Sequence, residues 1–428
     1  MTVTVVVGSQ WGDEAKGKVV DLLSAQAEVV ARFNGGDNAG HTVVNPFGAF
    51  KLRLTPNGFS NPKAICAIGP GVVINPVTLL EEIRSIESHG INLRERFWVS
   101  PRCHVVMPYH PLLESIYERA KGRAKTGTTG RGMGPVYADK VSYNGIRLFD
   151  LFDEAVFAEK LRVQLSIKNP ILQAFDLQPL DFQQVFDDKL AQFSQFKEVV
   201  REPFGLIQDA LRRQAGVLLE GAQAALLDTD WGTYPFCTAS NTLAGGACAG
   251  LGIAPRWIGR VIGVAKAYTT RVGGGPMPTE LFDEAGKTLL EAGREFGTVT
   301  GRPRRCGWFD AELVRFTARL NGCSELALTK LDVLDSLPTL KICTGYRSPD
   351  GGEDALHHYW EGDARWLGSV IPVYEELEGW MQPTTEARRW EELPPQAQAY
   401  IRRVESLVGV PVGLVSVAPE RDAVLRVP

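Results

Sequence analysis

The sequence predicts an α/β protein with a large, mostly parallel central sheet flanked by helices, a P-loop-like N-terminus and a helical insertion. The first observation is Val3–Val7, which is apolar on both faces, as in a strand buried within a parallel sheet. The second is that similar short apolar runs alternate along the chain with helix-spaced patterns. The third is the glycine-poor stretch 150–215, whose Leu, Phe, Gln, Lys and Asp predict several helices. We therefore expect one domain over 1–428, with a helical insertion at about 150–215.

The N-terminal strand, loop and helix form the first unit of this fold. After Val3–Val7 the apolar pattern breaks from Gly8 to Gly17, and Lys18–Ala27 resumes it at helix spacing. A strand, a glycine loop and a helix in this order are typical of phosphate binding. Further strands are expected at Val29–Phe33, Ala64–Ile68, Val217–Leu219, Val261–Val264 and Glu325–Leu328. Further helices are expected near Val77–Ser88, Pro111–Lys121, Asp310–Asn321 and Gln396–Val408.

Composition narrows the class of protein. The 428 residues are 44% hydrophobic and 22% charged, which is typical of a globular chain. A net charge of -4 argues against binding to nucleic acid or to an anionic membrane, and no apolar run approaches the ~20 residues of a transmembrane helix. The seven cysteines have no C-x-x-C spacing, so we expect reduced thiols in a cytoplasmic protein. The 44 glycines exceed the roughly 30 of an average chain, which indicates special backbone positions.

The loop after the first strand carries a phosphate-binding pattern. Gly12–Lys18 fits G-x-x-x-x-G-K, in which backbone N–H groups and a lysine bind phosphate. Val19 stands where a P-loop has the Ser or Thr that ligates Mg²⁺. If a nucleotide binds here, another group must hold the metal, and Asp13 is the obvious candidate. The alternative is a strand-to-helix turn with solvated charges.

A second glycine-rich loop, Asn34–Thr42, follows the second strand and carries His41 and the amide of Asn38. Because parallel sheets bind ligands at the carboxyl ends of their strands, this loop is expected beside the first one. Asp13 and His41 suit a base and an acid, provided that their pKa values are pushed apart. The alternative is a structural histidine.

Two later regions offer groups for a second nucleotide. Lys125–Gly134 combines hydroxyls, backbone amides and an arginine, which suits a second phosphate, although a surface loop has a similar composition. Glu220–Gln223 and Asp228–Thr238 follow an apolar strand. Gln223 suits the edge of a base and Thr238 suits a phosphate; in isolation, a tight structural turn explains them as well.

Two further motifs carry charge. Val299–Arg305 brings three arginines and Thr300 together, which suits a carboxylate or phosphate clamp, the alternative being a solvated basic turn. Thr329–Asp332 ends a strand. The carboxylate of Asp332 can accept hydrogen bonds from N1–H and the 2-amine of guanine, and Lys330 can lie along the ring face, as in the guanine-reading motif of GTPases.

Taken together, these motifs resemble those of the adenylosuccinate synthetase family. They occur in the family's order and span most of the chain. The match rests on QWGDEAKGK (10–18), NGGDNAGHT (34–42), GTTGRGMGP (127–135), EGAQAALLDTDWGTYP (220–235), TRVGGGPMPTEL (270–281), TGRPRRCGWFD (300–310) and LTKLDVLD (328–335).

The resemblance implies a GTP-dependent ligase that joins IMP and L-aspartate and yields adenylosuccinate, GDP and phosphate, the committed step from IMP toward AMP. Asp13 would remove the N1 proton of IMP, the 6-oxygen would attack the γ-phosphoryl group of GTP with His41 as acid, and the aspartate amine would displace phosphate from C6. Phosphorylation makes this substitution feasible, since a 6-oxo group is a poor leaving group. The family is a homodimer with one Mg²⁺ per subunit, and one subunit donates an arginine to its neighbour's IMP phosphate.

The resemblance also assigns residues to each ligand. Catalysis would fall to Asp13, His41, Lys16 and Gln223, and Mg²⁺ to Asp13 and the carbonyl of Gly40. The GTP site would comprise Gly12, Asp13, Glu14, Ala15, Lys16, Gly17, Lys18, Gly40, His41, Thr42, Arg304, Lys330, Leu331, Asp332, Ser416, Val417 and Ala418. The IMP site would comprise Asp13, Glu14, Ala15, Lys16, Asn38, Ala39, Gly40, His41, Thr128, Thr129, Gln223, Thr238, Val272 and Arg302. The L-aspartate loop would comprise Thr298, Val299, Thr300, Gly301, Arg302, Pro303 and Arg304.

Three positions depart from the family's pattern. Ala15 replaces a glycine of GDEGKGK, and alanine costs about 1 kcal/mol there if the site requires a positive φ. Tyr143 stands at the position of the arginine that reaches the neighbouring subunit, and a tyrosine cannot neutralise a phosphate. Ser416–Ala418 replaces a Ser-x-Gly segment on the guanine side. Two alternatives therefore stay open: a sister ligase for another purine nucleotide and a non-enzymatic GTP-binding switch, against which the missing Ser or Thr speaks.

Overall fold

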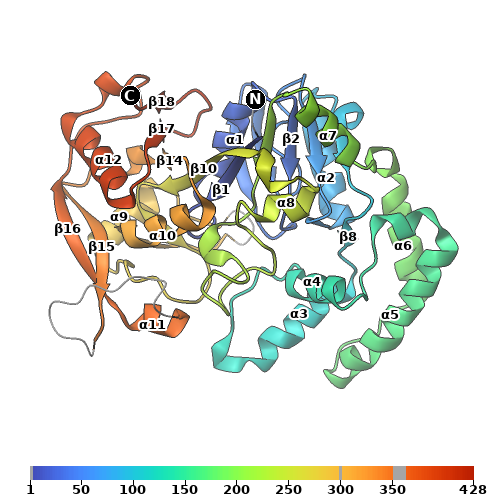
Figure 1. Ribbon diagram of the computed structural model, residues 1–428. Helices are drawn as coiled ribbons and strands as arrows, with labels where there is room; N and C mark the ends of the chain where they lie inside the picture. The colour runs from blue at the N-terminus through green and yellow to red at the C-terminus, as the bar shows by residue number, and fades with distance from the viewer. Residues whose placement is uncertain (1–2, 298–300, 350–362) are drawn as a thin grey trace.

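The central sheet runs through the whole molecule. The computed structural model describes residues 3–297, 301–349 and 363–428. Nine strands lie in the order β18-β17-β14-β10-β1-β9-β2-β5-β7 (Figure 1). Neighbouring strands are parallel from β17 to β7, and β18 adds an antiparallel edge, which confirms the mostly parallel sheet. The bounds are β1 (Val3–Gly8), β2 (Val29–Arg32), β5 (Ile65–Ile68), β7 (Phe97–Val99), β9 (Val217–Glu220), β10 (Ile258–Lys266), β14 (Glu325–Thr329), β17 (Val412–Ser416) and β18 (Val424–Arg426).

The helices expected from the periodicity all form, with ends that shift by a few residues. They are α1 (Lys16–Ser24), α2 (Pro76–Glu87), α3 (Tyr109–Ala120), α10 (Ala311–Asn321) and α12 (Pro395–Val408). Local chemistry sets their ends. The Asp310 carboxylate accepts the N–H of Leu313 at the start of α10, and Gly322 ends the helix at a φ of 59°. The side chain of Asn75 caps α2 in the same way.

The strands β7, β17 and β18 of the central sheet and several elements outside it were not anticipated. The expected loop Asn34–Thr42 ends in a strand, because His41 and Thr42 open the hairpin β3 (His41–Asn45) and β4 (Gly48–Leu52). A separate sheet joins β13 (Phe309–Asp310), β15 (Thr339–Arg347) and β16 (Ile371–Glu378). β3, β4 and β16 are only partly buried, so they lack the continuous apolar runs that mark the central strands. The remaining elements are β6 (Val73–Ile74), β8 (His104–Val105), β11 (Thr269–Arg271), β12 (Arg305–Gly307), α4 (Met133–Val141), α8 (Gly246–Leu251), α9 (Glu284–Ala292) and α11 (Ala364–Ser369).

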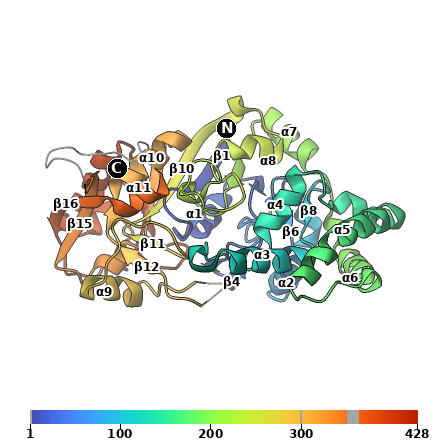
Figure 2. The same ribbon diagram turned by 90° about the horizontal axis from the view of Figure 1, so that it is seen from below.

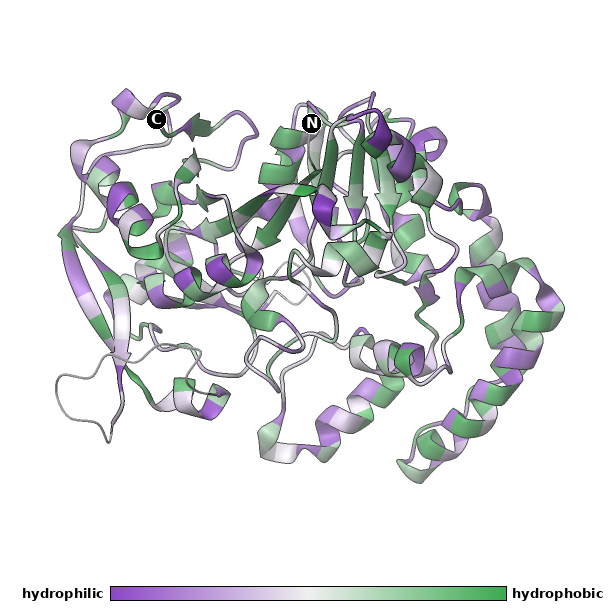
Figure 3. Ribbon diagram, viewed as in Figure 1, coloured by the Kyte–Doolittle hydropathy of each residue, from purple (hydrophilic) through white to green (hydrophobic). Residues whose placement is uncertain are grey.

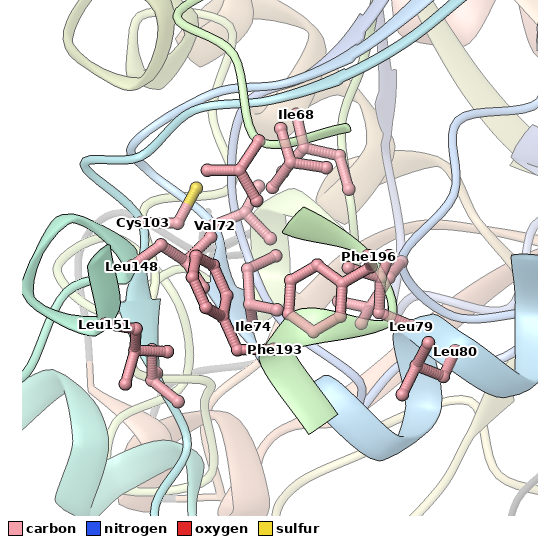
Figure 4. Packing of buried hydrophobic residues seen from close by; sticks show 14 of the residues in the cluster. Ile68, Val72, Ile74, Leu79, Leu80, Cys103, Leu148, Leu151, Phe193 and Phe196 are labelled. Atoms are coloured by element: carbon pink, nitrogen blue, oxygen red, sulfur yellow. The ribbon is translucent and has the colours of Figure 1, made fainter. Parts of the chain in front are cut away.

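The helix-rich stretch forms α5 (Glu154–Ala174), α6 (Phe182–Ser194) and α7 (Phe204–Arg212). In Figures 1 and 2, α5 and α6 lie at the end of the molecule opposite β15 and β16. They are joined to the sheet by buried side chains rather than by a linker. Figure 4 shows Phe193 and Phe196 packed among Ile74 and Leu79. Because this core is shared, we infer one domain with α5 and α6 as an insertion.

The hydropathy of the chain follows these layers. Figure 3 shows mainly hydrophobic residues on the strands of the central sheet and mixed faces on the helices around it. This is the distribution expected of a sheet that helices cover. Among the described residues, no helix has the length and apolar character to span a bilayer.

Candidate active site

Two cavities meet where the loops leave the carboxyl ends of the central strands. The first, of about 420 Å³, is here named the threonine cavity after Thr128, Thr129 and Thr238 in its wall. The second, of about 360 Å³, is here named the phosphate-loop cavity, since Lys16 and Gly17 line it. Both cavities are lined by Gly12, Asp13, Ala39, Gly40 and Gln223. A third cavity, of about 680 Å³, shares Tyr234, Pro235 and Phe236 with the threonine cavity. Of the three arginines in the expected clamp Val299–Arg305, it is lined by Arg305 alone.

The turn into α1 has the backbone that the sequence suggested. Ala15 precedes α1 at a φ of 60° and a ψ of 36°, the left-handed region that favours glycine. Beneath this turn, Glu14 is buried and its Oε1 accepts the N–H groups of Gln10 at 3.1 Å and Gly12 at 2.8 Å. Its Oε2 accepts from Nζ of Lys16 at 2.7 Å. Glu14 therefore shapes the loop from within, and Lys16 faces the phosphate-loop cavity.

Asp13 belongs to a network of charges that extends below the cavities. Oδ1 of Asp13 accepts from Nη2 of Arg304 at 2.8 Å, and Nη1 of Arg304 donates to Oε2 of Glu295 at 2.6 Å. Oε1 of the fully buried Glu295 also accepts from Lys266 at 2.8 Å and from Lys330 at 2.7 Å. Burial opposes the charge of Glu295, but these three cations hold its pKa far below the usual range.

Glu295 and Lys266 were missed by the sequence analysis. Burial lowers the pKa of Lys266 to about 8, against the attraction of Glu295. A lysine that ends a long apolar strand was a usable signal for a buried charge. Glu295, which follows α9, gave none, because only the fold brings it beside β10 and β14.

His41 is oriented by an amide and a carboxylate. Nδ2 of Asn57 donates to Oε1 of Glu220 at 2.6 Å. Nε2 of His41 lies 2.8 Å from this Nδ2 and 3.0 Å from Oδ1 of Asn57, so it accepts from the amide nitrogen in one tautomer and donates to the amide oxygen in the other. Burial, followed by the charges of Arg32 and Lys16, lowers the pKa of His41 to about 3. A neutral imidazole that accepts at Nε2 keeps its proton on Nδ1.

Asp13 and His41 line the same cavity, but their hydrogen bonds go to Arg304 and Asn57 respectively. The low pKa of His41 agrees with an imidazole that is uncharged near neutral pH. The pairing of Asp13 and His41 as base and acid therefore stays a hypothesis for the complex with ligands.

Most of the polar side chains in the wall of the threonine cavity are neutral hydroxyls and amides. Nε2 of Gln223 donates to Oδ1 of Asn38 at 2.9 Å, and Nδ2 of Asn38 donates to Oγ1 of Thr238 at 3.3 Å. Gln223 has a φ of 59° and lines both cavities. The glycine loop opposite is held to α3, since Oε2 of Glu114 accepts the N–H of Gly132 at 2.8 Å.

The segment expected to contact guanine lies where β14 and β17 run side by side. Lys330 has a φ of 58°, and its Nζ donates to the carbonyl of Gly293 at 2.6 Å and to Glu295. Burial raises the pKa of Asp332 to about 6, although Lys330 and Lys18 oppose the rise. Leu331 and Val417 are fully buried, so only their backbones can face a ligand.

The structure distributes the predicted ligand residues over four groups. The threonine cavity is lined by Gly12, Asp13, Asn38, Ala39, Gly40, Thr128, Thr129, Gln223, Thr238 and Val272. The phosphate-loop cavity is lined by Gly12, Asp13, Ala15, Lys16, Gly17, Ala39, Gly40, His41, Thr42, Gln223, Arg304 and Lys330. Neither lining includes Glu14, Lys18, Gly301, Arg302, Pro303, Leu331, Asp332, Ser416, Val417 or Ala418. Thr298, Val299 and Thr300 lie outside the described residues.

The predicted aspartate loop is described only from Gly301 onward. The N–H of Gly297 donates to the carbonyl of Arg302 at 2.8 Å, and Gly297 lines the threonine cavity. The base of this loop therefore lies at the cavity, while the Arg302 side chain is exposed.

Comparisons with known proteins point to one family. The family model "Adenylosuccinate synthetase" matches residues 5–425. The adenylosuccinate synthetase of Heliobacterium modesticaldum is 47% identical over 427 residues, covering 100% of this chain and 99% of the relative. That of Gloeobacter violaceus is 48% identical over 428 residues, covering 100% and 96%.

Two solved structures are also similar. The fully ligated adenylosuccinate synthetase from Plasmodium falciparum matches with a TM-score of 0.93 and 34% identity, covering 100% of both chains. A succinoaminodeoxyadenylate synthetase of cyanophage S-2L, bound to dGMP and to dATP as an energy donor, matches with a TM-score of 0.60 and 22% identity. That match covers 100% of this chain and 95% of the phage chain, and at this identity it shows the fold alone.

Proposed function

Since this chain belongs to the adenylosuccinate synthetase family, we propose that the threonine cavity binds IMP and the phosphate-loop cavity binds the phosphates of GTP. The enzyme is a GTP-dependent ligase that joins L-aspartate to IMP, a step in the synthesis of AMP.

One observation carries it: the two cavities share Asp13, Gly40 and Gln223. Transfer of a phosphoryl group from GTP to the 6-oxygen of IMP requires the two nucleotides to meet in line, at contact distance. Two separate nucleotide sites would not allow this transfer. The carboxylate of Asp13 and the amide of Gln223 in the shared wall support a base and a hydrogen-bonding group at the meeting point.

Each step of the reaction can be assigned to a residue in the shared wall or beside it. Asp13 accepts the N1 proton of IMP, and the 6-oxygen attacks the γ-phosphorus of GTP while the bond to GDP breaks. Arg304 orients the Asp13 carboxylate, to which it donates at 2.8 Å. His41, neutral and protonated on Nδ1, donates to a phosphoryl oxygen. The amine of L-aspartate then attacks C6, phosphate leaves, and the amine loses a proton.

The donor set at the shared wall fits Mg²⁺. The carboxylate of Asp13 and the carbonyl of Gly40 are hard oxygen ligands, and Mg²⁺ commonly takes one or two protein ligands beside water and phosphate oxygens. Among the described residues, no group of three or more His, Cys, Asp or Glu side chains forms a protein-only metal site. A metal bound at Asp13 and Gly40 neutralises phosphoryl charge.

We also propose a cytoplasmic homodimer with one Mg²⁺ per subunit. Tyr143 follows α4 with a φ of 67°, and its side chain is 97% exposed. This is the position from which the family's arginine reaches the neighbouring IMP site. An aromatic side chain that projects from a turn suits contact with a second subunit.

A second candidate, a ligase for another purine nucleotide, rests on Tyr143 and Ala15. The identity of 47–48% to adenylosuccinate synthetases, against 22% to the phage enzyme, favours IMP. A set of purine mononucleotides that includes dGMP separates the two candidates, because a strong preference for any nucleotide other than IMP would contradict the proposal.

The direct test combines purified protein with IMP, GTP, Mg²⁺ and L-aspartate. We expect adenylosuccinate, GDP and phosphate in equal amounts, and no adenylosuccinate when aspartate or IMP is left out. Asp13→Asn removes the base and should lower kcat by about 10²–10⁴-fold while the circular dichroism spectrum stays unchanged. Full activity of this variant would contradict the role of Asp13.

A further inference from the structure

Lys16 and Lys18 both belong to the phosphate-binding pattern, but they point to different places. In a helix, residues two apart are separated by about 200° around the axis, so they cannot face one site. Lys16 lines the phosphate-loop cavity. Lys18 is buried on the other side of the first turn of α1 and is not part of that lining.

The ammonium group of Lys18 is occupied by the C-terminal segment. Its Nζ donates to Oγ of Ser416 at 2.7 Å, to the carbonyl of Ala418 at 2.5 Å and to the carbonyl of Ala423 at 3.0 Å. These three acceptors use all three hydrogens of an ammonium group. Lys18 therefore fixes a backbone segment that returns on itself from 416 to 423 to the first turn of α1.

The fixed segment lies beside the predicted guanine contact. β17, which ends at Ser416, pairs with β14, which leads into Asp332. Pro419, in the same segment, lines the phosphate-loop cavity together with Lys330. The charges of Lys18 and Asp332 attract each other, which favours the ionised carboxylate at a place where burial opposes it.

We propose that Lys18 is a positioning residue for the guanine end of the GTP site. It holds the segment 416–423 against α1 and supports the Asp332 carboxylate, and it thereby sets the preference for a guanine base. The inference rests on the proposed function, since it takes the base of GTP to lie at Asp332. The two lysines of the motif Gly12–Lys18 then have different roles. Lys16 contacts the phosphates of GTP, and Lys18 positions the groups that bind its base.

The test compares GTP with ITP, which lacks the 2-amino group that Asp332 is expected to bind. In Lys18→Met the segment loses three charge-assisted hydrogen bonds and Asp332 loses its neighbouring cation. We expect Kd and KM for GTP to rise about tenfold or more, KM for ITP to rise much less, and kcat to fall far less than KM rises. Titration calorimetry measures Kd without turnover.

Arg421→Gln is the matched control. Arg421 ties the same segment to the same helix, through Nη2 to the carbonyl of Asp21 at 2.9 Å and Nε to Oδ2 of Asp21 at 3.3 Å. It should leave the GTP-to-ITP ratio unchanged. If Lys18→Met does not fold, Ser416→Ala keeps the lysine and two acceptors and should shift the ratio in the same direction by a smaller factor.

Two results would overturn the inference. An equal rise in Kd for GTP and ITP would show that Lys18 has no effect specific to guanine. A fall in kcat with both nucleotides at unchanged KM would place Lys18 with the phosphates. Wild-type protein that makes no adenylosuccinate would instead contradict the proposed function, while binding of GTP and ITP would still test Lys18.

Discussion

The two halves of the proposed active site are built from different chemistry. Among the residues that the structure describes, five cationic side chains and two carboxylates line the phosphate-loop cavity, whereas two of each line the threonine cavity. Both cations of the threonine cavity are already engaged. Arg271 lies over the ring of Trp11 at 3.9 Å and donates to Thr233, and Lys121 pairs with Glu118 at 2.9 Å.

This difference has a functional consequence. GTP carries more charge than IMP, and the cavity proposed for its phosphates is lined by five cationic side chains, of which Lys16 and Arg32 are buried. The cavity proposed for IMP offers hydroxyls and amides, which position a phosphate without neutralising it. A charge for the 5′-phosphate of IMP therefore has to come from a neighbouring subunit or from a rearranged side chain.

Removal of the Glu295 carboxylate should destabilise the charged network beside the phosphate-loop cavity. Glu295→Gln leaves the buried Lys266 and the partly buried Lys330 and Arg304 without their shared partner, and we expect a loss of about 3–5 kcal/mol in the free energy of unfolding. Denaturant unfolding followed by circular dichroism measures it. Glu280→Gln, at the partly exposed pair with Arg305, is the control and should cost about 1 kcal/mol or less.

The same substitution has a pH signature. The pKa of Glu295 is lower in the folded protein than its ordinary value of 4.5, so its contribution to stability is complete above 4.5 and is lost as pH falls below that value. The difference in stability between wild type and Glu295→Gln should therefore be constant near neutral pH and shrink in acid. A difference that grows in acid would contradict the assigned direction of the shift.

The two halves also differ in how far the sequence predicted them. Buried strands and amphipathic helices follow from local patterns, and Gly12–Lys18 and Asn34–Thr42 could be placed together because parallel strands end at one edge. The network around Glu295 could not be predicted, since its members come from distant elements with no shared motif. The direction of Lys18 was missed because a linear motif does not state which face of a helix each residue occupies.

A cation at position 143 should strengthen the binding of IMP in the threonine cavity. If a neighbouring subunit reaches the IMP phosphate from position 143, Tyr143→Arg supplies a charge-assisted hydrogen bond and should lower KM for IMP about tenfold with little change in kcat. Steady-state kinetics at saturating GTP and aspartate measure it. Tyr143→Gln controls for loss of the ring. An unchanged KM in Tyr143→Arg, with a raised KM in Lys121→Gln, would assign the charge to the same subunit.

The smallest expected change in stability concerns Ala15, in the turn that leads into α1. Ala15 adopts a φ of 60°, where a Cβ destabilises the folded protein by about 1–2 kcal/mol. A glycine removes this strain but raises the conformational entropy of the unfolded chain, which lowers stability by roughly 0.4–1 kcal/mol. Ala15→Gly should therefore raise the free energy of unfolding by about 0.5 kcal/mol. Ala25→Gly, at the other end of α1 with a φ of −56°, removes no strain and should lower it. Equal losses in both variants would mean that the Ala15 turn stores no strain.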